Sequence, residues 1–134
     1  MLIPVLVLTS AVYAQTEPPA SVATARQLYA SADYRAALDV LDHLAATSPA
    51  TSERLSIDLY RTLCLVALGR MREADETIAA MITRDPLFRP PDAEIPPRLR
   101  PLFSEQRKAL LPAIIQSRYA QAKHRSIGAT SQRP

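Results

Sequence analysis

An apolar run and an amphipathic run, separated by a single glycine, constrain this chain more than any other feature. Residues 63–68 are almost entirely apolar. After Gly69, apolar residues recur at helical spacing: Ala74, Ile78, Met81 and Ile82. Gly69 can adopt the left-handed conformation that ends a helix, and Pro86 cannot continue the second one. The pattern predicts two helices joined by a tight turn, whose apolar faces need a further helix pair beside them.

The composition favours helices along the whole chain. Hydrophobic residues make up 48% of the 134 residues, whereas aromatic residues make up 5%, Trp is absent and Gly occurs twice. This length suits one domain with a modest core. A core of Ala, Leu, Ile and Val, with little alternation of apolar and polar residues, predicts an all-α fold.

The same periodicity predicts two helices before residue 50 and a third after it. The first helix has an apolar face made of Val22, Ala25, Leu28 and Tyr29. Asp33 is expected to cap the second helix, whose apolar face consists of Tyr34, Ala37, Leu38, Leu41 and Leu44. Thr51 or Ser52 is expected to cap the third helix, over residues 53–68. That helix is apolar nearly all round after Leu59, which is typical of a helix covered on more than one side.

The two helix pairs share one spacing of small and apolar residues. Ala37, Leu41, Leu44 and Pro49 align with Ala74, Ile78, Met81 and Pro86 at an offset of 37 residues. This pattern resembles the tetratricopeptide repeat (TPR) family, whose 34-residue unit has a small residue early in its second helix, a large apolar residue four later and a closing proline. The resemblance covers residues 21–86 and implies two TPR-like helical hairpins, about 20–49 and 52–86. It departs from the family in lacking Trp and in placing Thr62 where Gly or Ala is usual. Helical hairpins packed together without kinship are the alternative.

The C-terminal part is predicted to contain a connector, a helix and a tail. Six prolines occur between residues 86 and 101, which indicates a stiff, extended connector over 87–97. Apolar residues then recur out to Tyr119, so a C-terminal helix is expected over 98–125, bent or split into a helix pair by Pro112. Residues 126–134 are expected to form a disordered tail. Because helical arrays need about three units, we expect this helix to cap the second hairpin. The alternative is a docking helix for a second chain, or for a membrane surface through four basic residues: Arg107, Lys108, Arg118 and Lys123.

The N-terminal segment has the pattern of a secretory signal peptide. Residues 2–12 are almost wholly apolar, and Val12-Tyr13-Ala14 is a small-x-small site, so cleavage is expected after Ala14. The run is shorter than the roughly 20 apolar residues that span a bilayer. No Lys or Arg precedes it, and a buried N-terminal helix or strand is the alternative. A signal peptide over residues 1–14 predicts an exported, periplasmic or secreted protein.

Charge and residue spacing argue against catalysis, cofactors and nucleic acid. The net charge is +3, but residues 15–86 carry −3 and residues 87–134 carry +6. The basic part has neither interleaved aromatic residues nor a nucleic-acid motif. His43 and His124 have no nucleophile and carboxylate at a recognisable spacing. Cys64 is the sole cysteine and is expected to be a buried small hydrophobe. No glycine-rich phosphate loop or metal-ligand spacing occurs, so we expect no enzyme activity, no cofactor and no metal.

The TPR resemblance also implies a binding surface. In that family the first helix of each hairpin lines a concave face that holds peptides. The corresponding residues here are Val22, Arg26, Tyr29, Leu59, Leu63 and Val66. Some relatives hold a partner's C-terminal carboxylate with Lys and Asn on this face, but Leu59 and Leu63 stand there instead, which predicts an apolar groove. The predicted function is a non-enzymatic adaptor of the bacterial envelope that binds a partner protein's peptide or helix, with Arg26 and Tyr29 fixing its orientation. The alternative is a peripheral envelope component whose basic C-terminal helix binds an anionic lipid or a cell-wall polymer.

Overall fold

The computed structural model describes residues 20–47 and 50–130, with side chains described as far as residue 126. Within these ranges the chain forms five α-helices and one short 3-10 helix, and no strand. The all-α expectation is confirmed. The predicted signal peptide, residues 1–14, lies outside the described residues.

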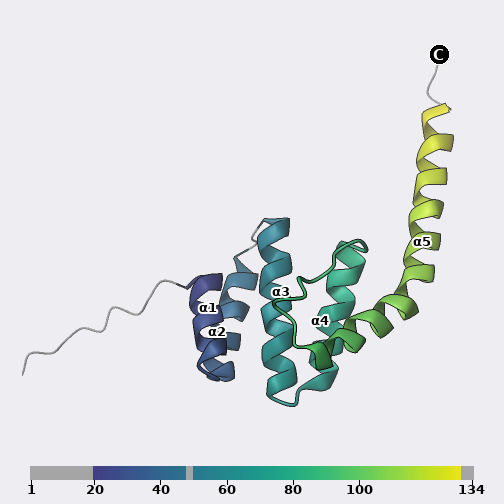
Figure 1. Ribbon diagram of the computed structural model, residues 1–134. Helices are drawn as coiled ribbons and strands as arrows, with labels where there is room; N and C mark the ends of the chain where they lie inside the picture. The colour runs from purple at the N-terminus through teal and green to yellow at the C-terminus, as the bar shows by residue number, and fades with distance from the viewer. Residues whose placement is uncertain (1–19, 48–49, 131–134) are drawn as a thin grey trace, which may run out of the picture.

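The first two helices begin at the side-chain caps that their sequences offer. Helix α1 (Val22–Ala30) follows Ser21, whose hydroxyl accepts a hydrogen bond from the Thr24 N–H. Helix α2 (Tyr34–Ala46) follows Asp33, whose carboxylate accepts a hydrogen bond from the Ala36 N–H, as expected. The turn between them contains Ala32 at φ 62°, in the left-handed region that disfavours a β-carbon. The two helices pack against each other beside α3 (Figure 1).

Helix α3 (Thr51–Ala67) is the centre of the fold. It contacts α1, α2 and α4, which explains why its sequence is apolar on several sides. Its N-cap is Ala50, which makes no side-chain capping bond, so the expectation that Thr51 or Ser52 caps this helix is wrong. Thr51 is instead the first helical residue.

The turn after α3 has the predicted geometry. Gly69 adopts φ 75°, and the Arg70 N–H donates to the Leu65 carbonyl, which closes the end of α3. Helix α4 (Met71–Arg84) follows and ends just before Asp85-Pro86. The core gathers large apolar side chains from α2, α3 and α4 that are almost fully buried: Leu41, Ile57, Leu59, Leu63, Ile78 and Met81.

The proline-rich connector is part of the packed body. Ile95 is 5% exposed and Leu99, in the 3-10 helix η1 (Pro97–Leu99), is 7% exposed, and both belong to the apolar core. In Figure 1 this segment crosses in front of α3 before it reaches α5. The connector was expected to be an extended spacer because of its prolines, and the structure shows that it also covers one face of the body. We call the connector the strap where it covers this face.

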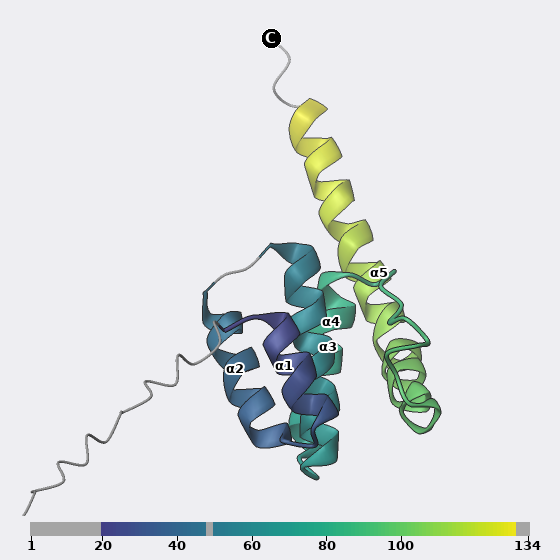
Figure 2. The same cartoon turned by 60° about the vertical axis from the view of Figure 1, so that its left-hand side comes forward.

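Helix α5 (Arg100–Thr130) is packed over its first half only. Phe103 is buried, and Leu102, Leu110 and Ile114 are half-buried against the body, where α5 contacts α4. Every side chain described from residue 115 to 126 is exposed, and beyond Arg118, which reaches the Thr83 carbonyl of α4, the second half stands clear of the other helices (Figure 2). The helix continues to Thr130, whereas a tail was expected from Ser126.

Pro112 lies inside α5 without splitting it. The helix changes direction between its packed and projecting halves (Figure 1), in keeping with the expected bend. Among the described residues, no helix combines the length and apolarity needed to cross a membrane.

Candidate interaction surfaces

The six residues predicted to line a concave groove do not form an open groove. Leu59 and Leu63 are each 1% exposed and belong to the core. Val22, Tyr29 and Val66 are half-buried, and Arg26 is exposed. A partner could therefore reach Arg26 directly, but not the two leucines in this arrangement.

The connector covers part of this inner face, which α1 and α3 form together. The Arg26 guanidinium lies 3.1 Å from the Glu94 carboxylate, 68 positions later in the chain. The same guanidinium lies 5.0 Å from the centre of the Tyr60 ring, a cation–π distance. Arg26 of α1 thus contacts the connector through Glu94 and α3 through Tyr60. The sequence had predicted that this arginine would orient a bound partner.

The tyrosines of this face are packed together and partly withdrawn from water. The Tyr29 ring centre lies 5.4 Å from that of Tyr34 and 6.0 Å from that of Tyr60. Burial raises the pKa of both Tyr29 and Tyr60, and the charges of the connector act on them as well: Arg98 lowers the pKa of Tyr29 and Glu94 raises that of Tyr60. The connector is held next to these tyrosines by the contact of Glu94 with Arg26, which in turn lies over the Tyr60 ring.

The four basic residues proposed from the sequence fall into two groups. Arg107 donates hydrogen bonds to the Pro86 and Phe88 carbonyls and so joins α5 to the connector, and the neighbouring Lys108 is exposed and lies 2.9 Å from Glu105 of the same helix. Arg118 lies where α5 leaves the body and makes a long contact of 3.5 Å with the Thr83 carbonyl. Lys123 is exposed and makes no ion pair within residues 20–47 and 50–130.

The projecting half of α5 carries an apolar stripe between cations. Ile115 and Tyr119, one helical turn apart, are 62% and 72% exposed, and they are the exposed large hydrophobic residues of α5 among those described. At 100° per residue, Arg118 falls on one side of this stripe and Lys123 on the other. No acidic residue follows Glu105 in the sequence, so the surface is uniformly basic. We call this surface, Ile115, Arg118, Tyr119 and Lys123, the basic stripe.

A buried carboxylate between α3 and α4 escaped the sequence analysis. Asp58 is 2% exposed, and Arg54, Arg61 and Arg84 surround it at 3.4, 3.6 and 2.7 Å. One of its oxygens has no hydrogen-bond partner among the described residues. The available signals were an aspartate in the helix with the most buried residues and the helical spacing of Arg54 and Arg61 around it. Arg54 and Arg61 lie one turn before and one turn after Asp58 on the same helix, whereas Arg84 comes from α4, and only this last partner is beyond the reach of sequence spacing.

The metal-ligating and nucleophilic side chains of the described residues are the next feature. None of their His, Cys, Asp and Glu side chains form a group of three or more that could hold a metal ion. Cys64 is fully buried as expected, and burial, with a smaller effect of the Asp42 charge, raises the pKa of its thiol to about 11. A thiol in this environment stays protonated near neutral pH and is a poor nucleophile.

These features define an all-helical protein with a covered inner face and an exposed basic helix. No protein-family model, curated protein or solved structure matches the chain. The TPR resemblance therefore still rests on the spacing of residues 21–86.

Proposed function

We propose that this chain is a non-enzymatic binding protein of the bacterial envelope that attaches to an anionic lipid surface through the basic stripe of α5. The observation that carries the proposal is the exposure of Ile115 and Tyr119 between Arg118 and Lys123 on a helix that stands clear of the body. The helical body, built of two TPR-like hairpins in this proposal, serves as the scaffold. Export is supported by the signal-peptide pattern of residues 1–14.

The chemistry of the basic stripe matches that of a lipid interface. Helices that lie in such an interface bury an apolar face and keep Lys and Arg at its edges, where their stems can reach the headgroups. Each cation near an anionic membrane surface contributes about 1 kcal/mol at physiological salt. The absence of acidic residues after Glu105 favours an anionic surface over a neutral one.

The test is sedimentation of residues 15–134 with vesicles of phosphatidylcholine, with and without phosphatidylglycerol. We expect binding only to the anionic vesicles, and weaker binding as salt rises. Replacing both Arg118 and Lys123 by Gln should lower the partition coefficient about tenfold or more. Ile115→Ser with Tyr119→Ser should weaken binding without removing the salt dependence.

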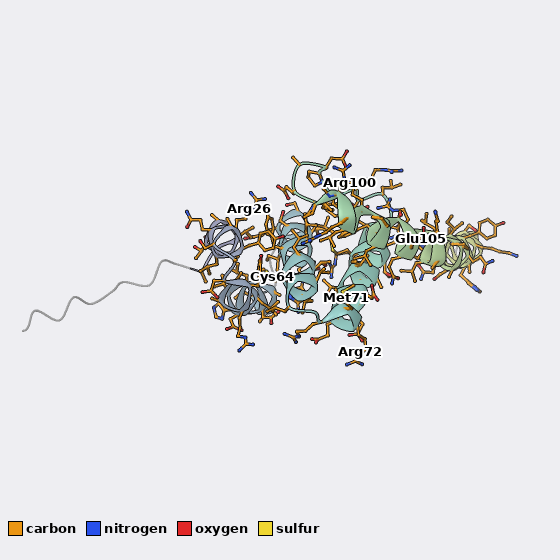
Figure 3. The ribbon with its side chains drawn as sticks, turned by 60° about the horizontal axis from the view of Figure 1, so that its bottom comes forward. Arg26, Cys64, Met71, Arg72, Arg100 and Glu105 are labelled. Carbon is orange, nitrogen blue, oxygen red and sulfur yellow. The ribbon has the colours of Figure 1, made fainter. Side chains whose placement is uncertain are left out.

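A matched control uses a cation of the body. Arg72 on α4 is exposed and lies outside the basic stripe (Figure 3), so Arg72→Gln should leave vesicle binding almost unchanged. Equal binding to neutral vesicles, or an equal loss in the Arg72 variant, would rule out the proposed surface.

A second candidate keeps the inner face as the binding site, for a partner protein's peptide or helix. It is supported by the way residues 94–98 lie on that face, held in part by the half-exposed Arg26–Glu94 pair. A partner segment would have to replace this strap. The probe is a synthetic peptide of residues 87–99 added to the Arg26→Gln and Ile95→Ala variants. Changes in the NMR signals of Tyr29 and Tyr60 would support it, and unchanged signals at saturating peptide would reject it.

A further inference from the structure

A surface cleft separates the connector from the beginning of α5. Its volume is about 520 Å³, within the range of small-molecule sites in proteins. It is lined by Arg89, Pro90, Asp92, Ile95, Arg100, Phe103, Ser104, Arg107 and Lys108. Figure 3 shows Arg100 where the connector meets α5, away from the projecting half of the helix. The cleft is therefore separate from both the inner face and the basic stripe.

The floor of the cleft is apolar and well packed. Ile95 and Phe103 are 5% and 7% exposed, since each is anchored in the core and only a small part of each faces the cleft. The floor would give an apolar ligand group a firm surface, because these side chains are already ordered and lose little freedom on binding.

The rim of the cleft holds positive charge that no carboxylate neutralises. Four cations line the cleft against a single acid, Asp92. Arg100 lies 3.7 Å from Asp92, and Lys108 lies 2.9 Å from Glu105, so these two cations have acidic neighbours. Among the residues that the structure describes, Arg107 contacts the Pro86 and Phe88 carbonyls but no carboxylate, and Arg89 makes no ion pair. Two arginine charges thus remain uncompensated beside the apolar floor.

We propose that this cleft binds a small carboxylic acid with an apolar tail, of the fatty-acid type. The carboxylate would meet the guanidinium groups of Arg89 and Arg107, which suit planar, two-oxygen acceptors. The tail would cover Ile95 and Phe103. Arg107 is held in place by its two carbonyl contacts, whereas exposed Arg89 closes on the ligand from the connector. This site is independent of the vesicle-binding surface proposed above.

The test is calorimetric titration of the full chain with decanoate, 1-decanol and decylamine, which share a tail and differ in charge. We expect one decanoate site per chain, and binding of the alcohol and the amine at least tenfold weaker. Arg89→Gln should lower decanoate affinity about three- to tenfold, the loss of one charge-assisted contact. Ser104→Trp, which fills the cleft from an exposed position, should abolish binding while circular dichroism confirms the fold.

Two matched variants separate this site from other cationic surfaces. Arg72→Gln on α4 and the Arg118→Gln, Lys123→Gln pair on the basic stripe should leave decanoate affinity unchanged. Equal affinity for decanoate and decanol would overturn the proposal, as would binding that survives Ser104→Trp. A loss caused by the basic-stripe pair but not by Arg89→Gln would place decanoate on α5 and reject the cleft.

Discussion

The carboxylate of Asp58 lies 2.7 Å from the guanidinium of Arg84 and so joins the middle of α3 to the last turn of α4. Arg54, one turn earlier on α3, contacts the same carboxylate oxygen and also donates to the Ala45 carbonyl at the end of α2. The buried Asp58 carboxylate of α3 therefore links this helix to α4 through Arg84 and, through Arg54, to the end of α2. Since the charge is 2% exposed, its removal leaves these cations without their common partner.

Asp58→Asn should lower the free energy of unfolding by about 3 kcal/mol, because it breaks a buried ion pair while keeping the side-chain shape. Urea unfolding followed by circular dichroism measures this difference. Glu76→Gln is the control, since Glu76 is 64% exposed and its pair with Arg72 is long at 3.7 Å. A loss below about 0.5 kcal/mol for Asp58→Asn would show that solvent already screens this charge.

Two turn residues should respond to substitution in opposite directions. Gly69→Ala should cost about 1 kcal/mol, because φ 75° disfavours a β-carbon. A β-carbon there would meet nothing within 4 Å, so the cost is purely conformational. Ala32→Gly should be neutral or stabilise by up to about 1 kcal/mol, since φ 62° is relieved while chain entropy rises. Thermal melts of the two variants measure both effects. Equal destabilisation by Gly69→Ala and Ala32→Gly would contradict the prediction of opposite effects.

The stability of the protein should fall in mildly alkaline solution. The unfolded Cys64 thiol has a pKa of about 8.5, and burial raises that of the folded thiol to about 11. Its stabilising effect is complete below the unfolded pKa and is lost as pH rises through this window. Cys64→Ala should reduce this loss, leaving the part due to Tyr29 and Tyr60, whose pKa values are also raised. A pH series of urea melts on both proteins checks the difference.

The Arg26–Glu94 pair should contribute little to global stability and more to the position of the connector. Side chains exposed to 46% and 28% predict a coupling energy of about 0.5 kcal/mol in a double-mutant cycle of Arg26→Met and Glu94→Gln. Hydrogen exchange in residues 87–96 should accelerate in Arg26→Met. Arg35→Gln on exposed α2 surface is the control and should leave exchange unchanged.

The two halves of α5 should differ in their contribution to stability. Deleting residues 116–134 should leave the thermal midpoint nearly unchanged, because every described side chain from 115 to 126 is exposed. Phe103→Ala, in the packed half, should cost about 3 kcal/mol, the usual penalty for removing a buried aromatic ring. A marked loss of stability on truncation would mean that the projecting half packs on the body in solution.

The prediction of the helices succeeded where local patterns specify them. Gly69 ends α3 in the left-handed conformation and Asp33 caps α2, because both depend on neighbours within a few residues in the chain. The prediction for the cap of α3 was also based on the local sequence, and it was wrong. Thr51 and Ser52 have side chains that can cap a helix, yet the helix begins at Thr51 with Ala50 as its N-cap and without a side-chain capping bond.

The binding surfaces were harder to predict because they depend on which long-range contacts form. The spacing of Leu59 and Leu63 is compatible with an open groove or with a core, and the covering by other elements decides between them. Prolines indicated that the connector is stiff, but not that Ile95 would anchor it in the core. The cleft proposed as a carboxylic-acid site exists only because the connector lies beside the start of α5.

Sequence alone determined the all-helical fold, the turn positions, the burial of Cys64 and the basic character of the C-terminal part. Each follows from periodicity, composition or a local backbone preference. Tertiary structure alone decided that the strap covers the inner face, that Arg84 of α4 reaches Asp58 of α3, and that α5 is packed over one half and free over the other. The physical reason is that burial depends on which elements meet in space, and such contacts join residues far apart in the chain, such as Arg26 and Glu94, which are 68 positions apart.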